Sequence, residues 1–184
     1  MRSLRRRFRR DPKYRDEYTV AIKKYEENGY SERVPDDEIV PKPGKASWLC
    51  HHGVPHERKN LRIVFDASRK LDGISLNNSI MQGPDLLSPM LGILLRFRQH
   101  LVAVSADIKS FFHCVRTPKE DADFARYLWF EDDNPDGAMT EFRMRVLLFG
   151  GISSQCCAVH AVRTAIYEAV SSNQLRMSEA EAII

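Results

Sequence analysis

The residues best suited to chemistry lie at the end of one apolar run. Residues 101–104 are apolar, as in a buried strand, and Asp107 stands where that run ends. A carboxylate in such a place is costly to bury unless a cation faces it, and a divalent metal that holds a triphosphate is one such cation. Phe112 follows five residues after this carboxylate. The pattern also fits a simpler interpretation, in which Asp107 caps a short helix that begins at Ile108.

A second candidate is a cation on a strand. Residues 61–66 are rich in β-branched and aromatic side chains between turn-forming residues, and therefore predict a strand. Side chains alternate along a strand, so Arg62 should point to the face opposite Ile63. Arg62 is then either a surface cation or a contact for an anion.

A third candidate is the loop at 149–155, which begins with Phe149 and Gly150. It joins a predicted strand to a predicted helix, and small residues just before a helix let a ligand lie close to backbone N–H groups. Many loops share this composition, so the loop alone is unspecific.

A cluster of metal-ligating residue types lies near residue 50. Zinc is one interpretation, but the spacing matches no closed tetrahedral pattern and no second ligand pair follows. A strand whose polar side chains find partners in the protein is the alternative that we favour. The residues concerned are Cys50, His51, His52 and His56.

The spacing of apolar residues predicts the elements that must position these side chains. Apolar residues three and four apart predict helices, and alternating ones predict strands. The apolar side chains of the second helix are expected to be core. The predicted helices cover about 11–28, 88–100 and 117–126, and a segment after the loop at 149–155.

Two further strands are predicted to form a hairpin, and one segment lacks any apolar period. Asp132 and Asp133 lie in the hairpin turn and are interpreted as loop acids rather than a metal pair. The strands cover 127–130 and 142–148, the turn covers 132–137, and residues 31–47 are predicted to be an extended connector.

Charge is spread unevenly over the 184 residues, although the formal net charge is only +3. Residues 1–10 hold six arginines and no acid, and the remaining residues carry slightly more acids than bases. Such a basic arm suits phosphate backbones or a nuclear import receptor. Leu4 and Phe8, four apart, also fit a transit peptide, which the nearby acid Asp11 argues against, and a solvated helix start is the simplest interpretation.

Composition also bears on the compartment. No apolar run approaches the ~20 residues of a membrane span, so no membrane partner is expected. The four cysteines accompany no secretory signal, which predicts reduced thiols and an intracellular protein, cytoplasmic, nuclear or both.

Several short motifs follow one another in an order that is more specific than any one of them. They lie at 25–35, 51–54, 61–68, 73–77, 94–98 and 106–109, with Phe112, Phe149-Gly150 and Ser153-Ser154. In this order and spacing the chain resembles the reverse transcriptase domain of LTR retrotransposons, most closely the BEL/Pao type, from about residue 11 to 170.

The resemblance implies an α+β fold, namely part of a right-hand polymerase. The fingers and an incomplete palm would be present, with antiparallel palm strands packed on helices. The implied divisions are a basic arm at 1–10, a helix and connector at 11–47, a fingers-like region with a helix leading to the palm at 48–100, and a partial palm at 101–184.

The resemblance also implies roles for individual residues. Asp107 corresponds to the first metal-binding carboxylate, and the Ile108 carbonyl to an additional ligand, in a centre of two Mg²⁺ ions. Arg62 corresponds to the arginine that grips the incoming dNTP. Phe112 corresponds to the aromatic that rejects a 2′-OH.

The loop residues and the partners follow from the same resemblance. Phe149 and Gly150 match the loop that shapes the nucleotide site and contacts the template. The implied partners of the intact enzyme are a dNTP and an RNA or DNA template-primer. Gln155 stands where the family loop usually has proline.

One departure from the family pattern bears on activity. The Tyr-x-Asp-Asp motif that supplies further catalytic carboxylates is missing from the 184 residues and is expected shortly after Ile184. We therefore expect a fragment of a Pol polyprotein without independent polymerase activity and without tight Mg²⁺ binding.

Two alternatives stay open. The first is a non-catalytic nucleic-acid-binding remnant. The second is a degenerate element product that does not fold stably, because missing palm strands would leave the central strand with an unpaired edge. The nucleic-acid-binding residues would be Arg5, Arg6, Arg7, Arg9 and Arg10.

Overall fold

The computed structural model describes residues 1–56, 59–99 and 101–177. The chain begins with two helices, α1 (Arg2–Arg10) and α2 (Pro12–Glu27). They separate at Asp11, whose carboxylate accepts a hydrogen bond from the Tyr14 N–H at 3.0 Å and so caps α2. Gly29, at φ +64°, ends the second helix in the left-handed region that glycine tolerates. The helix predicted for about 11–28 is therefore confirmed.

Three antiparallel strands form one small sheet in the order β1-β5-β4. The predicted hairpin is confirmed, with β4 (Arg126–Phe130) and β5 (Met139–Met144) as its arms. The extended connector predicted over 31–47 differs at its start, where β1 (Ser31–Arg33) is a paired strand at the end of β5. The buried Ser31 hydroxyl accepts a hydrogen bond from the Tyr127 hydroxyl at 2.9 Å, which fixes that end of the strand.

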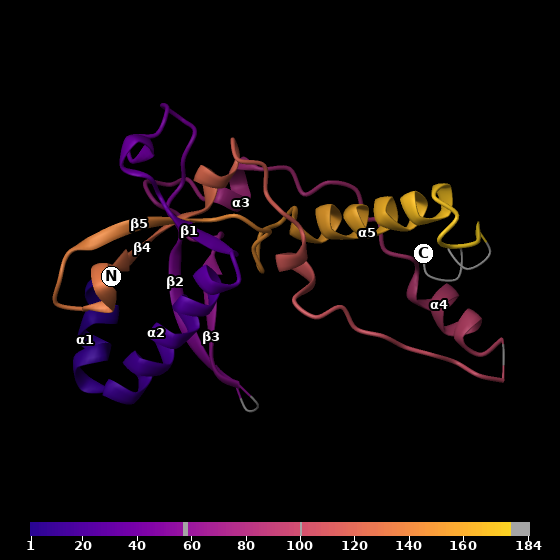
Figure 1. Ribbon diagram of the computed structural model, residues 1–184, viewed down its shortest axis with the longest axis horizontal. Coiled ribbons are helices and arrows are strands. Elements are labelled where there is room, and N and C mark those ends of the chain that lie inside the picture. Colours follow the sequence, from indigo (N-terminus) through magenta and orange to yellow (C-terminus); the bar gives the residue numbers. More distant parts are fainter. Residues whose placement is uncertain (57–58, 100, 178–184) are drawn as a thin grey trace.

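The second sheet is a two-stranded hairpin of β2 (Cys50–His56) and β3 (Lys59–Asp66), paired antiparallel with Gly53 opposite Ile63. The strand predicted at 61–66 is confirmed. Its side chains alternate as expected, because Ile63 and Phe65 are buried whereas Arg62 is exposed. Figure 1 shows α2 lying along this hairpin.

Aromatic rings join the two helices and both sheets into one core. Tyr18 of α2 is fully buried and stacks on Trp129 of β4, with ring centroids 5.5 Å apart and planes 9° apart. Phe8 of α1 lies edge-on to Tyr18 at 5.3 Å, so the first helix is part of the core. The largest fully buried side chains include Tyr18, Tyr127, Phe8, Phe130, Ile22, Met144, Val34 and Val146.

Two arginines lie inside the protein, although the alternating pattern around 142–148 predicts that Arg143 lies on the polar face of its strand. The side chains of Arg126 and Arg143 are 0% and 3% exposed. Asp123 pairs with both, at 2.8 Å and 3.0 Å. Burial raises the pKa of the Asp123 carboxyl, but its hydrogen bonds with the two arginines hold that pKa below its usual range. The remaining acidic partners are Glu32, Glu38 and Glu141.

Short helices connect these sheets. The helix predicted for 117–126 forms only as one 3₁₀ turn, because the chain passes directly into β4 at Arg126, whose N–H donates to the Ser47 carbonyl at 3.0 Å rather than to a carbonyl one turn earlier. The short helices are α3 (Leu76–Ser79) and 3₁₀ turns at Asp36–Glu38, Phe111–Cys114, Ala122–Ala125 and Glu131–Asp133.

Two longer helices lie outside the aromatic core. α4 (Met90–Phe97) forms where a helix is predicted, but the expectation that its apolar face is core is wrong: none of its residues is buried. Leu91 and Leu95 are 70% and 65% exposed. α5 (Ser154–Ser171) follows the loop as predicted, and along it only Ser154 and Ala158 are buried. Figure 1 shows α4 far from the sheets.

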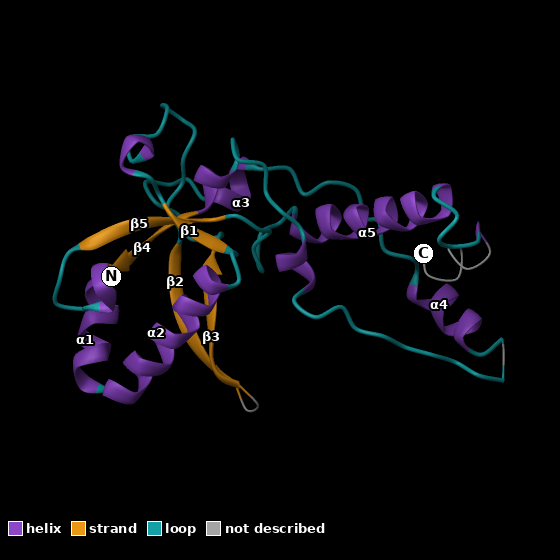
Figure 2. Cartoon of the chain, in the orientation of Figure 1, coloured by secondary structure: helices purple, strands orange, loops and turns teal. Residues whose placement is uncertain are grey.

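The buried strand predicted at 101–104 does not form. Residues 101–108 are extended loop without strand pairing, as Figure 2 shows, and Val102 and Val104 are 78% and 83% exposed. A strand is stable when neighbouring strands satisfy its backbone groups and cover its faces, and within the described residues none pairs with this segment. The apolar run therefore has no surface against which to be buried. The chain as a whole is α+β, with small antiparallel sheets, as predicted.

Candidate functional site

Three predicted site residues from distant parts of the chain meet around one ring. The guanidinium carbon of Arg62 lies 4.2 Å from the centroid of the Phe149 ring, a cation–π contact. The Phe112 ring lies edge-on to the same ring, with centroids 5.6 Å apart. Gly150 follows directly in the chain. The resemblance assigns all four residues to nucleotide binding, and the fold brings them together.

Backbone pairing explains why Phe112 reaches Phe149. The Leu147 N–H donates to the Val115 carbonyl at 3.1 Å, and the Thr117 N–H donates to the Arg145 carbonyl at 2.9 Å. These two hydrogen bonds hold residues 115–117 antiparallel to residues 145–147. The residues before Val115 therefore lie beside the residues after Leu147. The 3₁₀ turn Phe111–Cys114 lies in this position and also contacts α5.

The start of that 3₁₀ turn corrects the simpler interpretation of Asp107. A helix capped by Asp107 would begin at Ile108, but the turn begins at Phe111 after Ser110, whose φ is +56°. The Ser110 carbonyl, rather than any side chain, accepts the first hydrogen bond of the turn, from the His113 N–H at 2.7 Å. Asp107 is therefore not a helix cap.

A histidine that sequence reasoning missed lies next to this cluster. The His113 ring packs against Tyr25 and Tyr30, with centroids 5.4 Å and 4.7 Å apart. Burial lowers the pKa of the His113 imidazole, and the positive charge of Arg62 lowers it further. His113 stands directly after Phe112, but nothing in its sequence context signals that two tyrosines would enclose it.

Among the described residues, the Arg62 guanidinium forms no ion pair with an acid and lies instead over the Phe149 ring. This differs from Arg126 and Arg143, whose charges are offset by carboxylates. An arginine held by an aromatic face keeps its full charge and its hydrogen-bond donors available for an anion.

Asp107 and Ile108 lie in the exposed loop that precedes the 3₁₀ turn. The carboxylate of Asp107 has no hydrogen bond or ion pair within the part of the chain that the structure describes. Nowhere in that part do three or more His, Cys, Asp or Glu side chains gather as metal ligands would. Two Mg²⁺ ions each need several oxygen ligands, so one carboxylate and one carbonyl do not fit a two-magnesium centre.

Asp132 and Asp133 are loop acids, as predicted. Asp133 accepts a hydrogen bond from the Trp129 indole N–H at 2.8 Å and pairs with Lys23 at 2.8 Å. Both aspartates have positive φ in the turn between the hairpin strands. Their role here is to close that turn.

The residues Cys50–His56 form strand β2, in which His51 has polar partners, as we expect in preference to zinc. His51 Nε2 lies 3.0 Å from the Leu128 carbonyl, so it carries the proton and donates. Nδ1 then accepts from the Tyr18 hydroxyl at 2.5 Å. Burial lowers the pKa of His51 to about 4 despite the bond to Leu128, which favours the charged form. Of the other predicted ligands, Cys50 and His52 are exposed.

The basic segment 1–10 is a packed helix rather than a free arm. Leu4 and Phe8 are buried, so the charged face of α1 points outward. Three of the five arginines predicted to bind nucleic acid contact the protein instead: Arg5 donates to the Gly137 carbonyl, Arg7 lies over the Tyr14 ring and Arg9 pairs with Asp136. Arg6 and Arg10 are exposed and have no partner among the described residues, and the same holds for Arg2.

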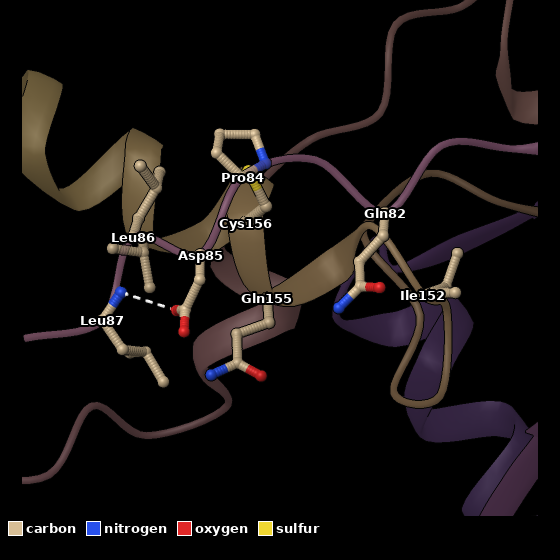
Figure 3. A pocket seen from close by; sticks show the side chains of 9 residues that line it. Gln82, Pro84, Asp85, Leu86, Leu87, Ile152, Gln155 and Cys156 are labelled. Atoms are coloured by element: carbon tan, nitrogen blue, oxygen red, sulfur yellow. Dashed lines mark hydrogen bonds between the residues drawn. The ribbon is translucent and has the colours of Figure 1, made fainter. Parts of the chain in front are cut away.

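One shallow cavity of about 190 Å³ lies between the segment 82–87 and the start of α5 (Figure 3). Gln155 and Asp85 point toward it, and the Asp85 carboxylate accepts a hydrogen bond from the Leu87 N–H at 3.0 Å. Ile152, two residues beyond Gly150, belongs both to this cavity and to the loop at 149–155. Sequence reasoning did not predict the cavity, because its walls come from an irregular segment and a helix.

Comparisons with known proteins leave the family open. No protein-family model matches the chain, and no curated protein matches it. No helix within the described residues is long and apolar enough to cross a membrane.

Proposed function

We propose that this chain supplies the fingers and the first part of the palm of a right-hand RNA-directed DNA polymerase of the LTR-retrotransposon kind. The observation that carries the proposal is the meeting of Arg62 and Phe112 at the Phe149 ring. These residues come from three separate segments, and the resemblance assigns all of them to one nucleotide site.

The chemistry of the cluster suits a deoxynucleoside triphosphate. Phe149 holds the Arg62 guanidinium without neutralising it, so the cation is preorganised for an anionic phosphate chain. Phe112 offers a flat apolar ring that tolerates a deoxyribose and would clash with a 2′-OH. Binding and sugar selection are therefore the tasks that this chain's own residues perform.

Catalysis needs more than these residues provide. Asp107 is one carboxylate in an exposed loop, and the donor set around it does not fit two Mg²⁺ ions. We therefore expect the 184 residues to bind nucleotide without extending a primer. Robust dNTP incorporation on poly(rA)·oligo(dT) by the purified chain would contradict this expectation.

Nucleotide binding is tested by titrating the chain with dGTP and following the heat of binding. Arg62→Ala should weaken binding by about ten- to a hundredfold, since a charge-assisted hydrogen bond contributes about 1.5–3 kcal/mol. Arg69→Ala is the matched control, because Arg69 is also exposed and lies just beyond the same strand. Equal losses in both variants would mean that only general charge matters, and the proposal would fail.

Sugar selection is tested in the same titration with GTP. The wild-type chain should bind dGTP more tightly than GTP, and Phe112→Ala should remove the difference. Phe111→Ala is the control, because Phe111 is the adjacent ring, 5.4 Å from Phe112 between centroids, and among the described residues its ring packs on Phe112 rather than on Phe149. A preference for dGTP that persists in Phe112→Ala would contradict the role given to this ring.

A second function, sequence-independent binding of nucleic acid, is favoured by the outward face of α1. Arg2, Arg6 and Arg10 recur every four residues, so they lie on one side of the helix with a rise of about 6 Å between neighbours. They are exposed and lack partners within the described residues, as a row of phosphate contacts requires.

This second function predicts salt-dependent binding of single-stranded RNA, measured by fluorescence anisotropy. Replacing Arg6 and Arg10 by serine should reduce the salt dependence by about two charges, since each phosphate contact contributes about 0.7–0.9 to the slope. Arg9→Ser is the control, because Arg9 already pairs with Asp136. Binding should also survive Asp107→Ala, and no binding at low salt would exclude this function.

A further inference from the structure

One side chain joins the strand that carries Arg62 to the loop that carries Phe149. The Asn77 amide nitrogen donates to the Gly150 carbonyl at 3.0 Å and to the Ser68 hydroxyl at 3.1 Å. Its amide oxygen accepts from the Ile152 N–H at 2.9 Å. Both amide hydrogens and the carbonyl are therefore used, and three segments meet at one residue.

The loop depends on such an attachment because burial does not hold it. Phe149 is 52% exposed and Ile152 is 39% exposed. Gly150 has φ +103°, a backbone conformation that side-chain-bearing residues rarely adopt. Exposed loops with few apolar contacts open at little cost in free energy, so hydrogen bonds decide where this loop lies.

The other end of the attachment is rigid. Ser68 comes two residues after β3, and the Asn77 backbone N–H also donates to the Ala67 carbonyl at 3.0 Å. Ala67 is buried at 2% exposure and directly follows β3, so Asn77 is anchored at the end of the strand that carries Arg62. The distance between strand and loop is thus set at this residue.

We infer that Asn77 is a positioning residue that holds Phe149 against the Arg62 guanidinium and so fixes the direction in which this cation points. Without the amide the loop is free to move from β3, and the cation–π contact is lost. The consequence for nucleotide affinity rests on the proposed function, whereas the positioning itself is independent of any ligand.

A purely structural role for Asn77 makes a different prediction. Asn77 lies in the short helix α3, whose cap is Ser75. If it served only to stabilise this helix, its replacement would change the stability of the protein and leave the Arg62–Phe149 contact intact. Its neighbour Asn78 lies in the same helix, is exposed and makes no side-chain hydrogen bond within the described residues. Asn78→Ala is therefore a matched control for Asn77→Ala.

The test is the side-chain Nε–Hε signal of Arg62 in the ¹⁵N-labelled chain. The ring current of Phe149 shifts this signal, and Phe149→Leu defines its position without the ring. Asn77→Ala should move the signal to the Phe149→Leu position, and Asn78→Ala should leave it unchanged. Asn77→Leu, which keeps the volume of the side chain, serves as a second variant should the alanine variant unfold.

The outcomes separate the inference from the proposed function. An unchanged Arg62 signal in a folded Asn77 variant, even with a lower thermal midpoint, overturns the positioning role. A moved signal supports it, and dGTP should then bind Asn77→Ala more weakly than wild type but more tightly than Arg62→Ala. If the signal moves while the wild-type chain does not bind dGTP, the positioning stands and the nucleotide function fails.

Discussion

The aromatic core and the segment around α4 are similarly apolar, yet only the first is packed. Tyr18 and Tyr127 are completely buried, whereas Leu91 and Leu95 remain mostly exposed. The core is built from strands paired in register, which bring rings from distant parts of the chain into contact. The segment 84–108 has no such pairing within the described residues. Apolar composition therefore does not by itself create a core, because burial requires an opposing surface.

The candidate nucleotide site lies between these two regions. Arg62 is carried by β3 of the packed region, and Phe112 follows the exposed loop that holds Asp107. The residues that would grip a nucleotide are positioned by paired backbone, whereas the carboxylate that would bind metal is not. This division is the reason that we propose nucleotide binding, rather than catalysis, for this chain.

The largest expected effect is the removal of Trp129 from the packed region. Trp129 stacks on Tyr18 and donates to Asp133, so Trp129→Ala should lower the free energy of unfolding by about 4 kcal/mol. Phe97→Ala in α4, where the ring is 50% exposed, should change it by less than about 0.5 kcal/mol. Urea unfolding followed by circular dichroism measures both, and similar losses would remove the contrast between the regions.

The second largest effect concerns acid stability. The pKa of His51 is about 4 in the folded chain against an ordinary value of 6.5, so the unfolded state binds a proton first as pH falls. Stability contributed by neutral His51 is present above pH 6.5 and is lost between 6.5 and 4, by up to about 3 kcal/mol. His51→Gln should flatten this part of the curve. His52→Gln, in the same strand but exposed, should not.

The third effect tests the buried arginines. Asp123→Ala removes a carboxylate shared by Arg126 and Arg143, and should cost about 2 kcal/mol because each arginine retains other acidic partners. Asp121→Ala, which removes an exposed acid from the residue just before the same 3₁₀ turn, is the control. A thermal midpoint that is the same in both variants would show that the network adds no stability.

The smallest effect should come from α4. Replacing Leu91 and Leu95 together by glutamate should leave the unfolding midpoint unchanged within error, because neither side chain is buried in the folded chain. A loss above about 1 kcal/mol would show that α4 packs on a surface in solution. The contrast between the two regions would then be wrong.

Prediction from sequence succeeded where local signals and pairing agree. α2 begins at the cap Asp11 and ends at Gly29, and both signals are visible in the sequence. The hairpin of β4 and β5 follows from alternation around a turn. The prediction of a strand at 101–104 was wrong, because an apolar run indicates burial but does not indicate which segment would cover it. Alternation likewise cannot predict that Arg143 turns inward, since that depends on carboxylates from distant segments.

The residues of the candidate site also separate into those that the sequence predicts and those that only the structure reveals. The order of the motifs in the sequence predicts Arg62, Phe112, Phe149 and Gly150 as candidate site residues. The contacts of Asn77 with Gly150 and of His113 with Tyr25 were not predicted, because each joins residues more than seventy positions apart.

By itself the sequence determined elements with strong local signals, such as α2 and the β4–β5 hairpin, and the alternation that exposes Arg62, since these depend on neighbours a few positions apart. Only the tertiary structure decided that the Phe149 ring would hold Arg62, that α1 would pack rather than extend, and that Asp107 would lie in an open loop. The physical reason is that burial and long-range contacts depend on which surfaces meet, and a linear pattern does not contain that information.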